Sequence, residues 1–139
     1  MKKLTKNTIE KAGNSDEILG LSLISASIVE VISLIEKRLE NQQKTFITTP
    51  NPEFLVFAQE NPWFRMILKQ ADLAIPDGVA LLWAREVLKG NNLPARLVIG
   101  FNTGLKVISQ GWGSKRVTGT DLTEKLCQLA AKNSYSVYF

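Results

Sequence analysis

Residues 44–54, KTFITTPNPEF, contain a transition from strand to helix from which the fold can be predicted. The first five residues are typical of a short strand. Asn51 followed by Pro52 is typical of a helix N-terminus, because the asparagine side chain accepts a hydrogen bond from the first turn and proline suits the first helical position. The stretch therefore predicts a strand that ends at a polar corner, Thr49-Pro50-Asn51, and runs directly into a helix.

Strand and helix signals alternate on both sides of this stretch. Upstream, Ser27 and Glu30 form a capping box in front of apolar residues at helical spacing. Downstream, Asn61-Pro62 repeats the helix start of Asn51-Pro52. The expected strands cover residues 17–24, 44–48, 71–75 and 135–139, and the expected helices cover residues 27–43, 52–60, 62–70, 79–90 and 120–133.

This order of elements predicts an α/β fold, a Rossmann-like parallel sheet flanked by helices. We expect a polar N-terminal lead-in over residues 1–16 and one domain over residues 17–139. Residues 91–115 mix proline, glycine and asparagine with short apolar runs, and we interpret them as an inserted loop. The chain stops inside an apolar strand, whereas a parallel strand is normally buried and followed by a crossover. We therefore expect the sheet to be incomplete at its C-terminal side.

The composition excludes several classes of function. A net charge of +4 without a block of like charges argues against nucleic-acid binding. Histidine is absent, which removes Ser-His-Asp and Cys-His catalysis and most zinc sites, so acid–base chemistry has to use carboxylates, lysine or tyrosine. The single cysteine, Cys127, excludes internal disulfides and indicates a reducing compartment. No apolar run approaches the roughly 18 residues of a membrane span.

Two polar corners fall where a parallel sheet binds ligands, in the crevice beyond the carboxyl ends of its strands. Thr49-Pro50-Asn51 ends one expected strand, and Asp77-Gly78 follows another. Both precede helices, whose free N–H groups suit phosphate. Asn51 and Asp77 can each be an N-cap only, or can cap a helix and also bind a ligand, and the residues leave both interpretations open.

Signatures of cofactors and metals are weak. Residues 111–116, GWGSKR, lack the third glycine of a dinucleotide fingerprint and the spacing of a P-loop, and no carboxylate cluster suits magnesium. If a diphosphate leaves here, arginine and helix ends have to stabilise it. Arg116 and Val117 precede a Thr-Gly-Thr-Asp turn that enters a helix, which either Thr120 or Asp121 can cap.

Three motifs occur in a characteristic order: TPNPEF (49–54), ADLAIPDGVALLWA (71–84) and RVTGTDL (116–122), followed by a strand such as SVYF. Together they resemble the WecG/TagA/CpsF family of bacterial glycosyltransferases over roughly residues 17–139. The resemblance implies an inverting, metal-independent enzyme without a cofactor, in the cytoplasm at the inner face of the cell membrane. Such enzymes transfer a sugar, often N-acetylmannosamine, from a UDP-sugar to a polyprenyl-diphosphate-linked acceptor in the synthesis of teichoic acid or other cell-surface polysaccharides.

The resemblance also implies roles for individual residues. The catalytic carboxylate falls on Asp77, and the polar pair of the sugar-nucleotide pocket falls on Thr49 and Asn51. The arginine of the family falls on Arg116. We expect three further residues of these motifs to line the same substrate pocket: Gly78, Gly119 and Asp121.

The chain departs from the family in two ways. Residues 91–115 lengthen the link to the arginine, so Arg96, which is closer to the family's spacing from Asp77, is the alternative to Arg116. The family also continues beyond this point into a C-terminal segment that contacts the membrane. A truncated chain can therefore lack activity or associate as a homo-oligomer. The alternative to an enzyme is a non-catalytic nucleotide-sugar-binding or assembly module.

Overall fold

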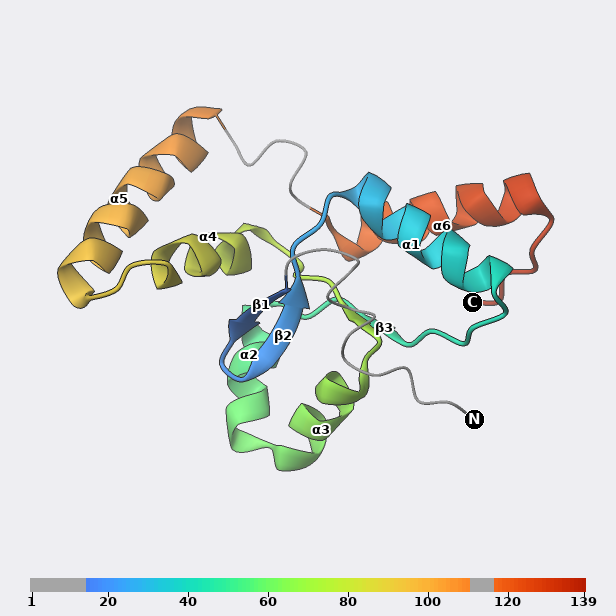
Figure 1. Ribbon diagram of the computed structural model, residues 1–139, viewed down its shortest axis with the longest axis horizontal. Helices are drawn as coiled ribbons and strands as arrows, with labels where there is room; N and C mark the ends of the chain where they lie inside the picture. The colour runs from blue at the N-terminus through green and yellow to red at the C-terminus, as the bar shows by residue number, and fades with distance from the viewer. Residues whose placement is uncertain (1–14, 111–116) are drawn as a thin grey trace.

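The computed structural model describes residues 15–110 and 117–139 (Figure 1). It confirms a mixed α/β chain, with six helices and four short strands in those ranges. The strands are β1 (Ser15–Ile18), β2 (Leu21–Ile24), β3 (Ile47–Thr48) and β4 (Leu73–Ala74). The helices are α1 (Ile28–Glu40), α2 (Pro52–Glu60), α3 (Pro62–Gln70), α4 (Val79–Leu88), α5 (Leu93–Gln110) and α6 (Gly119–Asn133).

The predicted starts of three helices are confirmed. Ser27 and Glu30 form the capping box of α1, in which the Ser27 N–H donates to the Glu30 carboxylate at 2.7 Å. Asn51 caps α2 and Asn61 caps α3, each accepting a hydrogen bond from the N–H three residues ahead, at 2.8 and 2.9 Å. A proline follows each of these asparagines at the first helical position, where its missing N–H costs no helical bond.

The expectation of one strand over residues 17–24 is wrong, because the chain forms a hairpin there. β1 and β2 pair in antiparallel register along their whole length. Leu19 and Gly20 join them, with φ of 51° and 76°. Two successive residues of positive φ form the tight turn whose twist matches that of paired strands. Leucine seldom adopts this conformation, so Leu19-Gly20 is not a recognisable turn signal in the sequence.

β3 and β4 form a parallel pair, as the alternation of strands and helices predicts. The N–H groups of Ile75 and Asp77 donate to the carbonyls of Thr48 and Pro50, both at 2.9 Å, so the pairing continues beyond the two strands. Asp77 also forms a parallel bridge with Val117. Within the described ranges, parallel pairing is limited to this pair and this bridge, so the extended Rossmann-like sheet that we expected is not shown.

Helices cover both faces of the β3–β4 pair. Side chains alternate along β4, so Leu73 and Ile75 pack on one face while Ala74 packs on the other. Figure 1 shows α1 and α6 side by side on one side of the strands and α2 with α3 on the other. The buried residues on the α1–α6 side are Ile24, Val31, Ile35, Leu73, Ile75, Val117 and Leu122. Those on the other side are Ile18, Leu21, Leu23, Leu55, Ala58, Leu68 and Leu81.

The expectation of a loop over residues 91–115 is wrong for most of that segment, which forms helix α5. The Asn92 side chain accepts the Ala95 N–H at 2.9 Å at the start of this helix, and Pro94 lies in its first turn, where proline is tolerated. A Cβ on Gly100 would lie 3.2 Å from the Trp83 ring of α4. Glycine therefore serves close packing of two helices here, rather than a turn.

Two expectations near the C-terminus are also wrong. Thr118 caps α6, in place of Thr120 or Asp121, and its Oγ1 accepts the Asp121 N–H at 3.1 Å. Residues 135–139 form no strand and are exposed. A strand needs a neighbour for its backbone N–H and C=O groups, and no described residue of this chain pairs with the segment.

Candidate active site

Three helices begin at the same edge of the parallel strands. α2 follows β3 through Thr49-Pro50-Asn51, α4 follows β4 through Pro76-Asp77-Gly78, and α6 begins two residues after Val117. The Asp77 N–H donates to the Pro50 carbonyl at 2.9 Å, and Asp77 bridges to Val117. Backbone bonds therefore hold the two predicted corners together and add the start of α6 to them.

The side chains of Thr49 and Asp77 meet in front of Gly119, the first residue of α6. A Cβ placed on Gly119 would lie 3.3 Å from Thr49 Oγ1 and 3.9 Å from Asp77 Oδ2. All three residues are half-buried, so the two polar groups remain accessible to a ligand. The predicted juxtaposition of Thr49 and Asp77 is present, and the missing side chain at Gly119 leaves room between them.

Asn51 caps α2 without using all of its hydrogen-bonding capacity. Its Oδ1 accepts the Phe54 N–H at 2.8 Å. An asparagine side chain also carries two amide donors on Nδ2, and no described residue of the chain accepts a hydrogen bond from them. The two interpretations left open by the sequence are thus compatible at Asn51, because it caps the helix and keeps donors for a ligand.

Asp77 does not cap α4. Gly78 occupies the N-cap position with φ of +90°, a conformation that favours glycine, and no side chain bonds to the first turn of this helix. Nothing lies within 4 Å of the point where a Cβ would stand on Gly78. The first N–H groups of α4 therefore lack a side-chain cap within the described residues. In the described part of the chain, no hydrogen bond or ion pair engages the Asp77 carboxylate.

The remaining predicted residues differ in how the structure places them. Asp121 is exposed in the first turn of α6, two residues after Gly119. Arg116 lies outside the described residues. Arg96 lies in the first turn of α5, where its Nε donates to the Gly90 carbonyl at 3.0 Å and links α5 to the end of α4. The structure does not bring Arg96 to the edge that holds Asp77.

Two hollows flank the parallel strands. One, of about 310 Å³, adjoins the edge described above, because Pro76 and Val117 line it together with the residues from Ile24 to Ser27 that lead into α1. The larger one, of about 560 Å³, lies between the hairpin and the start of β4 and reaches Pro50. None of the predicted site residues is among the described residues that line either hollow. We assign the site to the edge where Thr49 and Asp77 converge, because polar groups gather there and volume alone does not identify a site.

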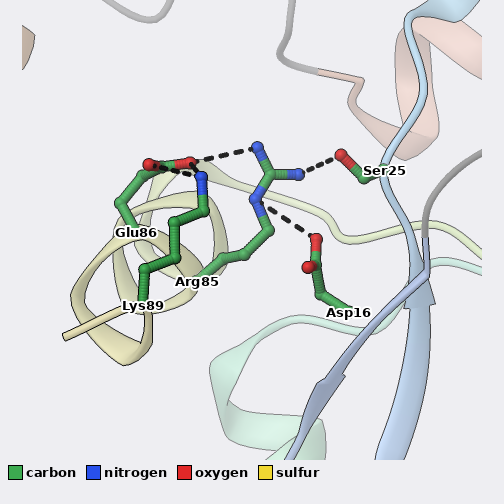
Figure 2. Close-up of polar contacts among 5 residues, drawn as sticks. All are labelled: Asp16, Ser25, Arg85, Glu86 and Lys89. Carbon is green, nitrogen blue, oxygen red and sulfur yellow. Dashed lines mark hydrogen bonds and ion pairs between the residues drawn. The ribbon is translucent and has the colours of Figure 1, made fainter. Parts of the chain in front are cut away.

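Arg85 of α4 reaches the wall of the smaller hollow, a feature that the sequence analysis missed. Figure 2 shows its guanidinium between Ser25, which follows β2, and Asp16 of β1. One terminal nitrogen donates to Ser25 Oγ, Nε lies 3.4 Å from Asp16 Oδ2, and the other terminal nitrogen lies 3.4 Å from Glu86 Oε1. Arg85 therefore ties α4 to the hairpin and to the turn before α1. Residues sixty positions apart in the chain carry no sequence signal for such a contact.

Glu86 also contacts Arg85, and its ion pair with Lys89 should make the folded state less stable in acid. Lys89 donates to both of its carboxylate oxygens, at 2.8 and 2.7 Å, and this lowers the pKa of Glu86 below its ordinary value of 4.5, although partial burial acts in the opposite direction. A lowered pKa in the folded state means that the stabilisation is present above about pH 4.5 and is lost as the pH falls through the folded-state value.

We expect the Tm of Glu86→Gln to depend less on pH in the acid range than the Tm of the wild-type chain. Between neutral pH and pH values below 4.5, the Tm of the wild-type chain should fall further than the Tm of Glu86→Gln. Glu40→Gln, which removes an exposed carboxylate at the end of α1, is the matched control and should keep the wild-type profile. An equal fall in Tm for the wild type and Glu86→Gln would contradict a stabilising role of the Glu86 carboxylate.

Neither a metal cluster nor a membrane span is found in the part of the chain that the structure describes. No three side chains of the types that bind metals gather there. No helix in that part is both long and apolar enough to cross a bilayer.

Comparison with known proteins bears on this site. The sequence profile of the glycosyl transferase WecG/TagA/CpsF family matches residues 17–111. The chain belongs to this family. The match includes Thr49, Asn51 and Asp77, while Gly119 and Asp121 follow it. The structure places Gly119 of this WecG/TagA/CpsF chain beside Thr49 and Asp77.

A relative with a named activity matches part of the chain. It is an N-acetylglucosaminyldiphosphoundecaprenol N-acetyl-beta-D-mannosaminyltransferase of Bacillus spizizenii, 30% identical over 78 residues. The aligned residues are 55% of this WecG/TagA/CpsF chain and 30% of the relative. The chain thus matches less than a third of the length of that relative.

Proposed function

We propose that this WecG/TagA/CpsF chain acts in the transfer of a hexose, N-acetylmannosamine or a related sugar, from UDP to a polyprenyl-diphosphate-linked acceptor during the synthesis of teichoic acid or another cell-surface polysaccharide. The observation that carries the proposal is the convergence of Thr49 Oγ1 and Asp77 Oδ2 in front of Gly119, at an edge where three helices begin. The name of the Bacillus relative specifies an N-acetylmannosaminyl group and an undecaprenol diphosphate acceptor, which supports this choice of sugar and acceptor.

In this proposal Asp77 is the general base. The acceptor hydroxyl is a weak nucleophile, and Asp77 takes its proton as the oxygen attacks the anomeric carbon. The bond from the acceptor oxygen to the anomeric carbon forms on the face opposite UDP while the bond to the UDP oxygen breaks, so the configuration at that carbon inverts. The open space beside Gly78 gives the acceptor access to the carboxylate.

The departing UDP needs partners for its developing negative charge. The first N–H groups of α4 have no side-chain cap and carry the positive end of the helix dipole, as does the start of α6 at Gly119. We propose that these N–H groups and Arg116 stabilise the diphosphate without a metal ion, and that Thr49 and the free amide of Asn51 bind the sugar or the diphosphate. Gly119 and Asp121 border the same space.

We also propose the setting in which the reaction takes place. β3 and β4 would belong to a Rossmann-like sheet whose ligand crevice is the edge beyond Thr48 and Ala74. The polyprenyl chain of the acceptor lies in the bilayer, so the protein would work from the cytoplasm at the inner face of the cell membrane.

A second candidate is a non-catalytic nucleotide-sugar-binding module, favoured by a match that covers only 30% of the relative. Titration of UDP and of UDP-N-acetylmannosamine into the chain, followed by addition of an acceptor analogue with a lipid diphosphate, separates the two. Binding with product formation supports the transferase, and binding without product supports the module. Absence of binding to either nucleotide contradicts both.

Asn51→Ala is expected to weaken UDP-sugar binding beyond its effect on stability. Asn51 and Asn61 cap consecutive helices with the same geometry, so Asn61→Ala is a matched control. Each substitution should cost about 1 kcal/mol of unfolding free energy, because each removes one helix cap. Only Asn51 lies beside Asp77, so only Asn51→Ala should raise the Kd for the UDP-sugar. Equal Kd values for the two variants, measured by calorimetry, would remove Asn51 from the pocket.

A further inference from the structure

Helix α5 exposes a broad apolar face. Figure 1 shows it at the periphery, with α4 between it and the rest of the chain. Six apolar residues of α5 form one continuous arc on a helical wheel, because each lies three, four or seven positions in the sequence from another of the six. Their exposed fractions are 70% for Leu93, 66% for Leu97, 60% for Val98, 69% for Phe101, 51% for Leu105 and 85% for Ile108.

The packing of α5 explains why this arc faces outward. Gly100 and Gly104 lie against Trp83 of α4, whose Nε1 donates to the Gly100 carbonyl at 3.0 Å. A Cβ on Gly100 would also lie 3.2 Å from the Val87 side chain. The fold thus uses two glycines of α5 for its contact with Trp83 of α4 and leaves the six large apolar residues named above exposed to solvent. Exposed apolar surface of this extent usually marks an interaction site.

The charge of this part of the chain indicates what kind of surface would cover the arc. No acidic residue occurs between Glu86 and Asp121, whereas five basic residues do: Lys89, Arg96, Lys106, Lys115 and Arg116. The whole chain carries a net charge of +4, so all other residues together carry −1. The positive charge of the protein is therefore concentrated in the segment that contains α5.

We infer that the α4–α5 pair docks on an anionic lipid bilayer, with the six apolar residues in the headgroup boundary. An interfacial helix combines an apolar face with basic residues elsewhere on its surface and lacks the overall hydropathy of a membrane span, as α5 does. The bilayer is favoured over a second copy of the chain. A symmetric dimer through this face would bring two basic segments together, whereas an anionic surface is complementary to them.

This inference does not depend on the proposed transferase activity, because bilayer binding requires neither donor nor acceptor. It would nevertheless set the position of the site relative to the bilayer. α4 begins at Val79, two residues after Asp77, and runs into the α5 pair. A bilayer that holds α5 would therefore hold the polar edge with Asp77 near the membrane surface.

Flotation of the chain with lipid vesicles tests the inference. We expect binding to vesicles of phosphatidylcholine and phosphatidylglycerol in a two-to-one mixture, and weaker binding to pure phosphatidylcholine or at high salt. The double variant Phe101→Glu and Ile108→Glu should lose at least about tenfold in partition coefficient, because two apolar side chains no longer enter the boundary. Both residues are mostly exposed, so circular dichroism should show an unchanged helix content.

The matched control places the same substitutions on another exposed apolar surface. Val56 and Trp63, on α2 and α3, are 58% and 68% exposed, and the two helices carry equal numbers of acidic and basic residues. The double variant Val56→Glu and Trp63→Glu should bind vesicles like the wild type. Equal loss in both double variants, or equal binding to neutral and anionic vesicles, would overturn the inference. A third result would also overturn the inference: the wild-type chain forms a dimer, the double variant Phe101→Glu and Ile108→Glu is monomeric, and neither binds vesicles. The apolar face of α5 would then bind a second copy of the chain.

Discussion

Asp77→Asn is expected to reduce sugar transfer by about 10²- to 10⁴-fold, the range typical of a lost general base. Asparagine keeps the size of the side chain, and the backbone bonds from Asp77 to Pro50 and Val117 do not involve the carboxylate. Donor binding should therefore persist. Rates of product formation at saturating donor and acceptor, together with calorimetry with UDP, measure the two quantities separately.

Asp72→Asn is the control for this prediction. Asp72 lies at the opposite end of the same parallel segment, where its carboxylate accepts the Phe46 N–H at 2.8 Å and pairs with Arg38 at 3.7 Å. Its substitution should lower the Tm but leave the turnover of the folded protein unchanged. Unchanged turnover in Asp77→Asn would exclude Asp77 from the chemistry, while loss of UDP binding would show that the carboxylate shapes the donor pocket.

Gly119→Leu is expected to block the space between Thr49 and Asp77. Its Cβ alone would stand 3.3 Å from Thr49 Oγ1, and the rest of the side chain would occupy the region into which both polar groups open. We expect the Kd for the UDP-sugar to rise at least about tenfold, the usual effect of a misfitted apolar group in a pocket. Leucine favours helix more than glycine by about 0.8 kcal/mol, so α6 should remain formed.

Gly104→Ala supplies the comparison for a helical glycine outside the site. A Cβ there would lie 3.9 Å from Trp83 Nε1, an ordinary contact, and we expect no change in UDP-sugar binding. The Kd of Gly119→Ala for the UDP-sugar should lie between those of Gly104→Ala and Gly119→Leu, since Thr49 has to shift by only a few tenths of an ångström. Wild-type affinity in Gly119→Leu would place the donor elsewhere.

Much of the fold could be predicted where local signals and packing agree. The caps at Ser27, Asn51 and Asn61 act within one helical turn, so the sequence specifies them directly. The hairpin turn and α5 could not be predicted in this way. Leu19 adopts a positive φ because the paired strands require it, and Gly100 packs against Trp83 seventeen positions away. Both depend on contacts that propensity does not contain.

The candidate site also contains residues that could be predicted from the sequence and residues that could not. Thr49 and Asp77 could be brought together from sequence because each follows a strand, and parallel strands end at one edge. Gly119 was expected in the pocket only through the family resemblance, and its contact with Thr49 became clear in the structure, since nothing in RVTGTDL shows that the start of α6 faces Thr49. Arg85 was missed for a similar reason, because its partners Asp16 and Ser25 come from the far end of the chain.

The bond between the Asp77 amide and the Pro50 carbonyl has a consequence for how such a protein could be retargeted. This main-chain hydrogen bond fastens the loop with Thr49 and Asn51 to the loop with Asp77, so the bond itself does not depend on the side chains that these loops carry. Exchanging Thr49 or Asn51 for other polar residues should then alter which donor is accepted while the scaffold keeps its shape. New sugar preferences could arise by single replacements at these corners, without rebuilding the layers beneath.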